Sequence, residues 1–299
     1  MDTVTIRQDI YDRVTAQIVE AISQGVDKFQ MPWHFSGALC EAPTNAVSKR
    51  PYRGINVLAL WAVARKREYP SGVWATYKQW KELGAQVRSG EKAAVVVLWK
   101  ANDRDEAGVD EEESNKSRRM LLARGYNVFN AAQVDGYQPP DTPQLSDNAR
   151  NDRAEQFFVA QEADIQHGGS AAFYDVDRDL IILPDYRNFR SVGGYYATLA
   201  HEMTHWTGEP RRLNRNLGNR FGSASYAMEE LIAELGAAFI CARLQLTPEV
   251  RTDHAAYIAN WLDVLKHDAK AVFTAAAKAQ QAADWLNDRA HGPGAVIAA

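Results

Sequence analysis

The sequence H-E-M-T-H at residues 201–205 constrains this chain more than any other feature, because it requires a helix that presents two imidazoles to one ion. It reads H-E-x-x-H, and the preceding residues 195–200 favour a helix. Residues four apart share one face of a helix, so His201 and His205 can both reach one metal ion. Glu202 can then lie beside a metal-bound water and act as the general base of amide hydrolysis. A chance match on an amphipathic helix is the alternative interpretation.

A catalytic zinc site needs a third protein ligand and one open position. A third histidine six residues after His205 is ruled out, because Arg211 stands there. A glutamate from a second helix is the other common solution. The helix predicted over residues 225–244 offers three acids: Glu229, Glu230 and Glu234.

The sequence leaves open which of these acids binds the metal. Glu230 and Glu234 have the i, i+4 spacing of a ligand followed one turn later by an acid that orients a ligand histidine. Glu229 instead shares a face with Ala233 and Gly236, which would let two helices approach closely. We therefore expect Glu230 as the ligand and Glu234 as the orienting acid, with Glu229 as the alternative ligand. A solvated acidic face is the remaining interpretation.

The few cysteines restrict the metal chemistry and the compartment. Cys40 and Cys241 are the only two, so a Cys-rich zinc site is excluded and a reduced, bacterial cytoplasmic chain is expected. Nitrogen and oxygen ligands favour Zn²⁺, while Mn²⁺, Co²⁺ or Ni²⁺ can occupy the same site. No apolar run approaches the roughly 20 residues that span a bilayer, and the polar N-terminus does not resemble a signal or transit peptide.

The length of 299 residues allows two domains of ordinary size. The Pro-rich, polar run 137–144 is the best linker, which places a boundary near residues 140–150. Periodicity predicts helices over 6–25, 54–68, 74–84, 150–164, 225–244 and 254–288, and strands over 95–99, 121–129, 171–174 and 180–183. The expected fold is α+β, with a nucleic-acid-binding domain over 1–140 and a mainly helical zincin-like domain over 150–299.

Two further features lie near the predicted His helix. The strand 180–183 directly precedes this helix, and by analogy with such enzymes we expect an edge strand that pairs with an extended peptide substrate. A plain structural strand is equally compatible with the residues. Three tyrosines, Tyr195, Tyr196 and Tyr226, are candidates to stabilise an oxyanion, although packing at the edge of the core is the commoner role of such residues.

A basic, aromatic stretch distinguishes the N-terminal half. Residues 49–100 carry 11 Lys and Arg against 3 Asp and Glu, whereas residues 103–113 carry 7 acids and 1 Arg. Five of the eight tryptophans lie between residues 31 and 100. Bases can stack on exposed aromatics while cations follow the phosphates, so sequence-tolerant binding of single-stranded DNA is predicted. The candidate contacts are Arg50, Tyr52, Arg53, Trp74, Tyr77, Lys78, Trp80, Lys81, Arg88 and Lys92.

The alternative for this stretch is a solvated basic face over a tryptophan-rich core. Several tryptophans are expected to be core residues in any case, which leaves at most two or three exposed stacking partners. The densest candidate runs from Trp74 to Trp80, and the next is residues 50–54.

At this point the chain resembles the ArdC-type antirestriction proteins. The motifs that carry the resemblance are Pro32-Trp33 and residues 52–56, 74–79, 83–92, 179–184, 196–208, 212–215 and 226–235. One departure, Glu209-Pro210, lies in the loop after the His helix and touches no ligand position. The resemblance implies a plasmid-carried protein that binds single-stranded DNA, protects DNA that enters by conjugation from host restriction, and carries a zinc metallopeptidase domain.

Three functional readings follow from these observations. In the first, the metallopeptidase cleaves an unidentified protein, for which a host restriction component is one candidate. In the second, the metal site is structural or vestigial, and the protein protects DNA by occlusion alone. A nuclease is the weakest reading, because nucleases commonly use carboxylate-rich magnesium sites.

Overall fold

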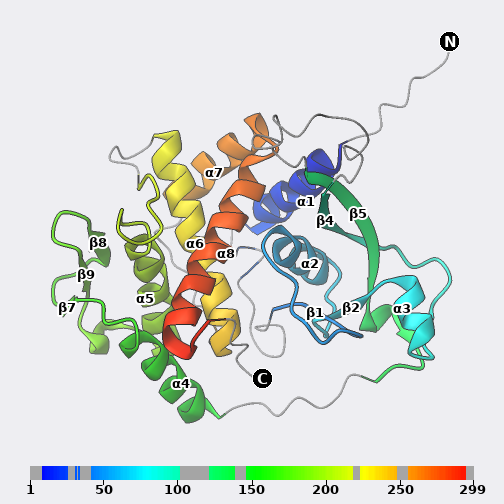
Figure 1. The fold of residues 1–299 in the computed structure, drawn as a ribbon, viewed down its shortest axis with the longest axis horizontal. Helices are drawn as coiled ribbons and strands as arrows, with labels where there is room; N and C mark the ends of the chain where they lie inside the picture. Colours follow the sequence, from blue (N-terminus) through cyan, green and yellow to red (C-terminus); the bar gives the residue numbers. More distant parts are fainter. Residues whose placement is uncertain are drawn as a thin grey trace, which may run out of the picture.

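The computed structural model of the chain describes most of both halves (Figure 1). The described residues are 9–25, 31, 33, 42–101, 121–138, 146–217, 223–247 and 255–293. The acidic run 103–113 and most of the predicted linker 137–144 therefore lie outside the described residues. Among the described residues, no helix is both long enough and apolar enough to cross a membrane.

The described residues of the N-terminal half form three α-helices and two small sheets. Its elements are α1 (Ile10–Gly25), β1 (Thr44–Asn45), α2 (Ile55–Lys66), β2 (Val73–Ala75), α3 (Tyr77–Glu82), β3 (Gln86–Val87), β4 (Ala94–Ala101), β5 (Leu121–Asn130), the 3-10 helix η5 (Ala131–Gln133) and β6 (Val134–Asp135). The larger sheet has the order β1-β2-β5-β4, and β3 pairs with β6. The strands predicted over 95–99 and 121–129 are confirmed as the antiparallel pair β4 and β5.

The predicted helix over 74–84 is shorter in the structure than expected. The helix expected over 74–84 begins only at Tyr77, because the preceding residues form β2, which pairs with β5. Thr76 ends the strand and caps the helix: its hydroxyl accepts from the Gln79 amide, and the Gln79 side chain accepts from the Thr76 amide in return. This capping box satisfies two backbone donors at the start of a short helix.

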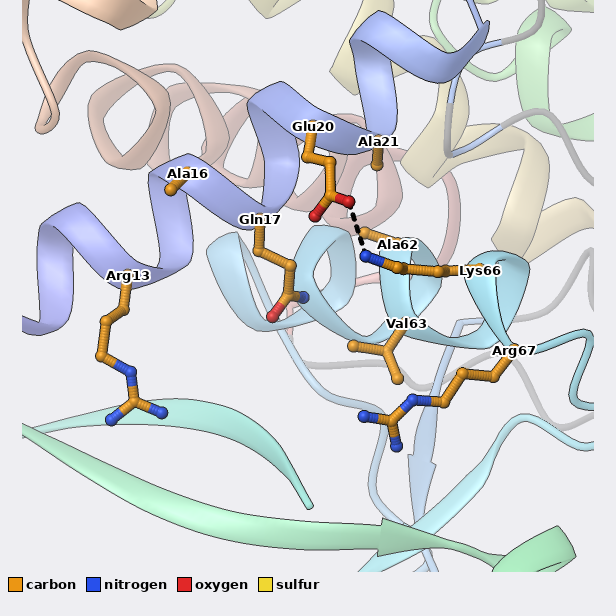
Figure 2. A pocket seen from close by; sticks show the side chains of 9 residues that line it. All are labelled: Arg13, Ala16, Gln17, Glu20, Ala21, Ala62, Val63, Lys66 and Arg67. Atoms are coloured by element: carbon orange, nitrogen blue, oxygen red, sulfur yellow. Dashed lines mark hydrogen bonds and ion pairs between the residues drawn. The ribbon is translucent and has the colours of Figure 1, made fainter. Parts of the chain in front are cut away.

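Helices α1 and α2 pack side by side and leave a groove between them (Figure 2). The Gln17 side-chain amide donates to the Ala59 carbonyl at 2.8 Å, and Lys66 pairs with Glu20 at 2.6 Å. The groove has a volume of about 350 Å³, and Arg13 and Arg67 lie along it beyond the Lys66–Glu20 pair. Because Arg13, Lys66 and Arg67 outnumber the single acid Glu20, the groove carries a net positive charge.

The C-terminal half is mainly helical, as predicted. Its elements are α4 (Asp147–Val159), β7 (Ile165–His167), β8 (Phe173–Asp175), β9 (Leu180–Leu183), the 3-10 helix η6 (Tyr186–Asn188), α5 (Val192–Trp206), α6 (Ala224–Leu244), α7 (Ala255–His267) and α8 (Ala271–His291). The predicted helix 150–164 ends at Val159, and the sequence analysis missed β7. The predicted helix 254–288 is two helices, α7 and α8, which are separated at residues 268–270.

The small sheet beside α5 corrects the expected role of residues 180–183. Its order is β7-β9-β8, with β7 parallel and β8 antiparallel to β9. Strand β9 is therefore central, and neither of its edges is open to a peptide. The expectation of an edge strand at residues 180–183 was wrong because β7 was not anticipated.

The two halves share a hydrophobic core, which the periodicity of single segments did not reveal. One cluster of buried residues includes Ile18 and Trp61 from the N-terminal half together with Phe239 and Trp261 from the C-terminal half. The rings of Trp61 and Phe239 lie 6.1 Å apart. Helix α8 runs between the two halves in Figure 1, and it packs against both α6 and α2.

Candidate functional site

Helices α5 and α6 bring the predicted metal ligands together. Ser191 caps α5 by accepting from the Gly194 amide at 3.0 Å. A Cβ atom at Gly236 of α6 would lie 2.5 Å from the Thr204 side chain of α5, so glycine permits this close approach. The prediction that Ala233 and Gly236 form a surface for close helix packing is therefore supported at Gly236.

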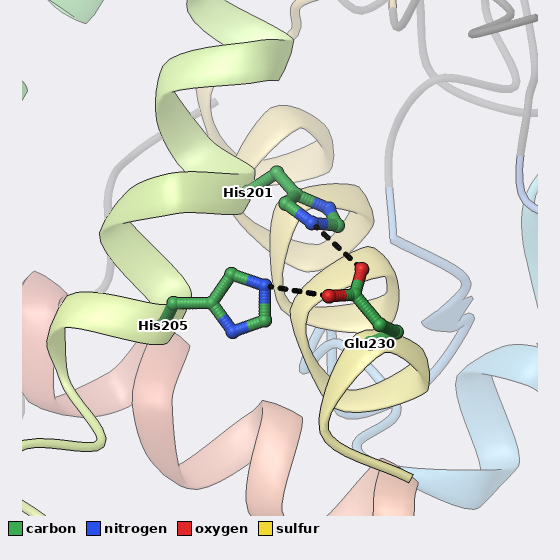
Figure 3. Close-up of side chains that lie close together, drawn as sticks. All are labelled: His201, His205 and Glu230. Atoms are coloured by element: carbon green, nitrogen blue, oxygen red, sulfur yellow. Dashed lines mark ion pairs between the residues drawn. The ribbon is translucent and has the colours of Figure 1, made fainter. Parts of the chain in front are cut away.

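His201, His205 and Glu230 form a cluster that can hold a metal ion (Figure 3). One ligand atom from each residue lies within 4.8 Å of the other two. The Glu230 carboxylate faces both rings, with one oxygen 3.5 Å from His201 Nε2 and the other 3.6 Å from His205 Nε2. In the described part of the chain, this is the one cluster of three or more such side chains.

The other nitrogen of each ring faces a different carboxylate. His205 Nδ1 lies 3.3 Å from Glu229 Oε1, and His201 Nδ1 lies 3.6 Å from Glu234 Oε2. A carboxylate behind Nδ1 favours the tautomer with its proton on that nitrogen, which leaves the Nε2 lone pair for a metal. The donor set and both tautomers thus fit a divalent cation bound by two imidazoles and one carboxylate.

This geometry favours Glu230 over Glu229 as the third ligand, the choice that the sequence left open. Glu229 also accepts from Arg215, whose Nη2 lies 2.8 Å from Oε1 and whose Nε lies 3.1 Å from Oε2. The two side chains are only 3% and 2% exposed, so each charge depends on the other for its solvation. Glu229 is thereby committed to Arg215 and to the back of His205.

Sequence reasoning assigned no role to Arg215. Besides Glu229, it donates to the Thr207 hydroxyl at 2.8 Å and to the Thr204 carbonyl at 2.6 Å. It therefore ties the loop after α5 to both ligand-bearing helices. The residue lies in a loop without a periodic pattern, so the resemblance motif at residues 212–215 was the one signal that touched it.

The ionisation of these acids suits a cation site. Burial raises the pKa of Glu230, but the hydrogen bond from His201 and the charges of His205 and His201 outweigh burial and lower the pKa to about 2. Burial likewise raises the pKa of Glu229, while hydrogen bonds from His205 and Arg215 bring it below its ordinary value. Both side chains are therefore carboxylates at neutral pH.

The remaining candidates near the metal centre occupy different environments. Glu202 is 3% exposed and lies next to His201 on α5. The Tyr226 hydroxyl hydrogen-bonds the Glu230 carboxylate, which places it at the ligand set. Tyr196 donates to Glu155 at 2.7 Å, and Tyr195 bonds His167 at 3.0 Å, so these two tyrosines are held elsewhere.

Two predicted DNA contacts are corrected by their burial. Trp74 and Trp80 are both 0% exposed and cannot stack on a base. Trp74 packs edge-on against Tyr69, and the Trp80 indole donates to the Phe129 carbonyl at 3.0 Å. Both therefore belong to the core, which was the alternative interpretation of the aromatic stretch.

Two other predicted contacts are held by neighbouring residues. Tyr52 is half-buried, and its hydroxyl accepts from the Asn45 side chain at 3.2 Å. Arg53 stays exposed but forms an ion pair with Asp284 on α8, which joins the two halves of the molecule.

The other six predicted contacts are exposed, namely Arg50, Tyr77, Lys78, Lys81, Arg88 and Lys92. Tyr77 is 49% exposed and lines an open pocket of about 610 Å³ with Phe129 and Gln86. Arg88 lines the same pocket and is held by Glu91 at 3.0 Å and Asp135 at 3.3 Å. Arg13 of α1 lines the α1–α2 groove together with Lys66 and Arg67, although it lies outside the basic stretch 49–100 in the sequence.

Each half of the chain matches a known protein family. Residues 8–129 match the family described as the N-terminal domain of anti-restriction factor ArdC. Residues 152–278 match the family described as zincin-like metallopeptidase. The second match contains all three residues of the candidate metal site.

Relatives match the chain along nearly its whole length. The antirestriction protein ArdC of plasmid R388 is 39% identical; its metal-free crystal structure has a TM-score of 0.78 and covers 96% of this chain and 100% of that one. The Mn(II)-bound structure of the same protein has a TM-score of 0.76, with 95% and 98% coverage. The uncharacterized protein y4eC of Sinorhizobium fredii is 50% identical over 281 residues, which is 93% of this chain and 92% of that protein.

One longer relative matches this chain over only part of the relative's own length. A DNA primase TraC of Escherichia coli is 34% identical over 298 residues, which is 94% of this chain but 27% of that protein.

Proposed function

The chain belongs to the ArdC family of antirestriction proteins, and from that premise we propose that it binds single-stranded DNA with its N-terminal half and cleaves a protein at a divalent metal site in its C-terminal half. The observation that carries the peptidase is the cluster of His201, His205 and Glu230, and the buried Glu202 directly follows His201 in the sequence. The protein substrate is unidentified, and a component of the host restriction system is one candidate.

The donor set suits Zn²⁺, and Mn²⁺ is supported by the Mn(II)-bound structure of the R388 relative. A bound divalent cation would act as a Lewis acid toward a water molecule and the carbonyl of the scissile amide. His201 and His205 would hold it through Nε2, while Glu230 would contribute a carboxylate oxygen.

Glu202 is the proposed general base. It is buried next to a ligand histidine, where it would take a proton from the attacking water and pass it to the leaving amine. The Tyr226 hydroxyl lies at the Glu230 carboxylate and can donate a hydrogen bond to the substrate oxygen as negative charge develops there. Tyr226 is supported by its hydrogen bond to Glu230, and Glu202 by its burial and its place next to His201 on α5.

The DNA-binding proposal rests on two surfaces of the N-terminal half. The α1–α2 groove presents Arg13, Lys66 and Arg67 to a phosphate backbone (Figure 2). The pocket at Tyr77 offers an exposed ring on which a base can stack. The relatives named DNA primase, which contain a region like this chain, also act on DNA according to their name.

A binding titration of the full chain tests the DNA proposal. Labelled single-stranded and double-stranded DNA of mixed sequence would be titrated between about 50 and 200 mM salt. We expect single strands to bind more tightly, and Arg13→Ala and Arg67→Ala each to reduce the salt slope by about 0.7. Arg178→Ala, an exposed arginine of the β8–β9 turn, is the matched control. An unchanged slope in both groove variants would remove the groove from the proposal.

A Glu202→Gln variant tests whether protection needs proteolysis. Unmodified plasmid DNA would be introduced by conjugation into a restricting host that expresses either the original chain or the variant. We expect the variant to retain metal and DNA binding but to lose cleavage and protection. Glu162→Gln, an exposed acid at the end of α4, should behave like the original chain.

Occlusion of DNA without proteolysis is the competing function, because the exposed cations and Tyr77 would suffice for it. Full protection by Glu202→Gln would favour occlusion over the peptidase. Metal-dependent loss of a labelled single strand in the same samples would instead revive the nuclease reading.

A further inference from the structure

A tryptophan of the N-terminal half lies at the metal centre. The Trp33 indole Nε1–H donates to Glu234 Oε1 at 3.1 Å, and the tryptophan is 3% exposed. The other oxygen of Glu234 faces His201 Nδ1 at 3.6 Å. A polar connection therefore runs from Trp33 through the Glu234 carboxylate, with a hydrogen bond on one side and a 3.6 Å contact to the proposed ligand His201 on the other.

This connection matches the arrangement behind the second histidine. There, Arg215 holds Glu229, and Glu229 faces His205 Nδ1. Each ligand imidazole is thus backed by a carboxylate, and each carboxylate accepts a hydrogen bond from a further buried donor. Outer partners of this kind fix the orientation of a ligand and tune metal affinity.

The two donors differ in origin. Arg215 comes from the loop after α5, within the region that matches the metallopeptidase family. Trp33 comes from the region that matches the N-terminal ArdC domain. An indole N–H can only donate, so Trp33 engages one oxygen of Glu234 and leaves the other oxygen facing His201 Nδ1.

The segment that carries Trp33 is anchored on the N-terminal half. Arg65 of α2 donates to the Met31 carbonyl at 3.1 Å, and Met31 is fully buried. Helix α2 in turn packs on the C-terminal half through Trp61, whose ring contacts Phe239 of α6. Met31 is thus tied to α2, which packs on α8 and meets α6 through Trp61.

We infer that Trp33 is a positioning residue of the metal centre, so that the N-terminal half completes the metal site of the C-terminal half. The inference rests on the proposed function insofar as that function includes a metal at His201, His205 and Glu230. It adds that metal affinity depends on a residue outside the region that matches the metallopeptidase family.

The decisive experiment measures Zn²⁺ and Mn²⁺ dissociation constants of the full chain and its Trp33→Phe variant by competition with a chromophoric chelator. We expect about 10-fold weaker binding or more, the range typical of lost outer partners. Trp80→Phe is the matched control, because it removes an indole N–H that donates to a carbonyl at 3.0 Å and is equally buried. The control should bind metal like the original chain.

A double-mutant cycle separates positioning from general destabilisation. Glu234→Gln should weaken metal binding, and adding Trp33→Phe to it should have little further effect, because the two residues act through one connection. The absorption spectrum of the Co²⁺-loaded protein should change in both single variants and stay unchanged in Trp80→Phe.

Equal metal affinity of Trp33→Phe and Trp80→Phe, with both folded by circular dichroism, would overturn the inference and leave the proposed function standing. Absence of metal binding by the original chain would overturn both. Should Trp33→Phe fail to fold, Arg65→Met disturbs the same segment from α2 and should weaken metal binding several-fold. Unchanged affinity in a folded Arg65→Met variant would then overturn the inference.

Discussion

The metal centre and the aromatic, basic surface of the N-terminal half differ in how strictly the spacing of their residues fixes their geometry. At the metal centre, His201 and His205 lie together as their spacing on one helix requires, and packing of α6 on α5 adds Glu230. On the N-terminal half, Trp74 and Trp80, the ends of the densest aromatic run, are both fully buried.

The difference shows which kinds of pattern carry spatial information. H-E-x-x-H fixes the relative positions of its side chains, because the helix alone places residues four apart on one face. An aromatic stretch fixes nothing of this kind, since tryptophan serves equally as a core residue and as a stacking platform. Tyr77 lies between the two buried tryptophans in the sequence and is exposed. Composition alone cannot tell which of these aromatic residues is buried.

The largest expected effect tests the metal centre through its two adjacent glutamates. Glu230→Gln should weaken metal binding by far more than about 100-fold, because it removes a ligand, whereas outer partners typically cost about 10–100-fold. Glu229→Gln should stay within that smaller range. Metal titrations of both variants decide the point, and a greater loss in Glu229→Gln would make Glu229 the ligand.

The next effect tests the pair that holds Glu229. Arg215→Met should reduce the free energy of unfolding by about 3–5 kcal/mol, because it leaves a buried carboxylate without its partner. Urea unfolding of the metal-free protein measures this loss. Arg178→Met, at an exposed ion pair, should change the free energy of unfolding by less than about 0.5 kcal/mol. Similar values for both variants would contradict the buried role of Arg215.

The N-terminal surface is tested by two aromatic residues three positions apart. Trp80→Ala should cost about 3–5 kcal/mol of unfolding free energy, because it empties a fully buried site. Tyr77→Ala should leave stability almost unchanged and weaken single-strand binding by about 1–3 kcal/mol. Urea unfolding and DNA titration of both variants measure the two effects. The comparison fails if Tyr77→Ala binds DNA like the original chain.

The smallest effect concerns acid stability at the ion pair of Asp179 and Arg212. Hydrogen bonds from Arg212 lower the pKa of Asp179, with burial opposing and Tyr174 adding to the decrease. A pKa below the unfolded value of about 3.9 means that this pair stabilises the fold above that pH and loses its contribution as the pH falls through the folded pKa.

An Asp179→Asn variant isolates this contribution. Its unfolding free energy should be lower than that of the original chain at pH 6, and the gap should close below about pH 4. Urea unfolding of the variant and the original chain at both pH values measures how the gap in unfolding free energy changes with pH. A gap that persists at low pH would show that the loss comes from packing and not from charge.

Much of the fold followed from local patterns. The β4–β5 pair, the two ligand-bearing helices and the mainly helical C-terminal half were predicted because each lies in one continuous segment with clear periodicity. Strand β7 was missed because its pairing partner, β9, lies elsewhere in the sequence. The break between α7 and α8 was missed although it is local: the Asp268 side chain accepts from the Lys270 amide there. Because β7 was not predicted, the central position of β9 in its sheet was not predicted either.

The sequence by itself determined that two imidazoles share a helix face and that an acid-bearing helix follows, because helical geometry is local. Only the tertiary structure decided that Glu230 faces the metal position, that Glu229 turns to Arg215, and that Trp33 reaches Glu234 across the two halves. These choices depend on the rotation and spacing of packed elements. Many weak contacts between distant segments set that packing, and no single segment encodes it.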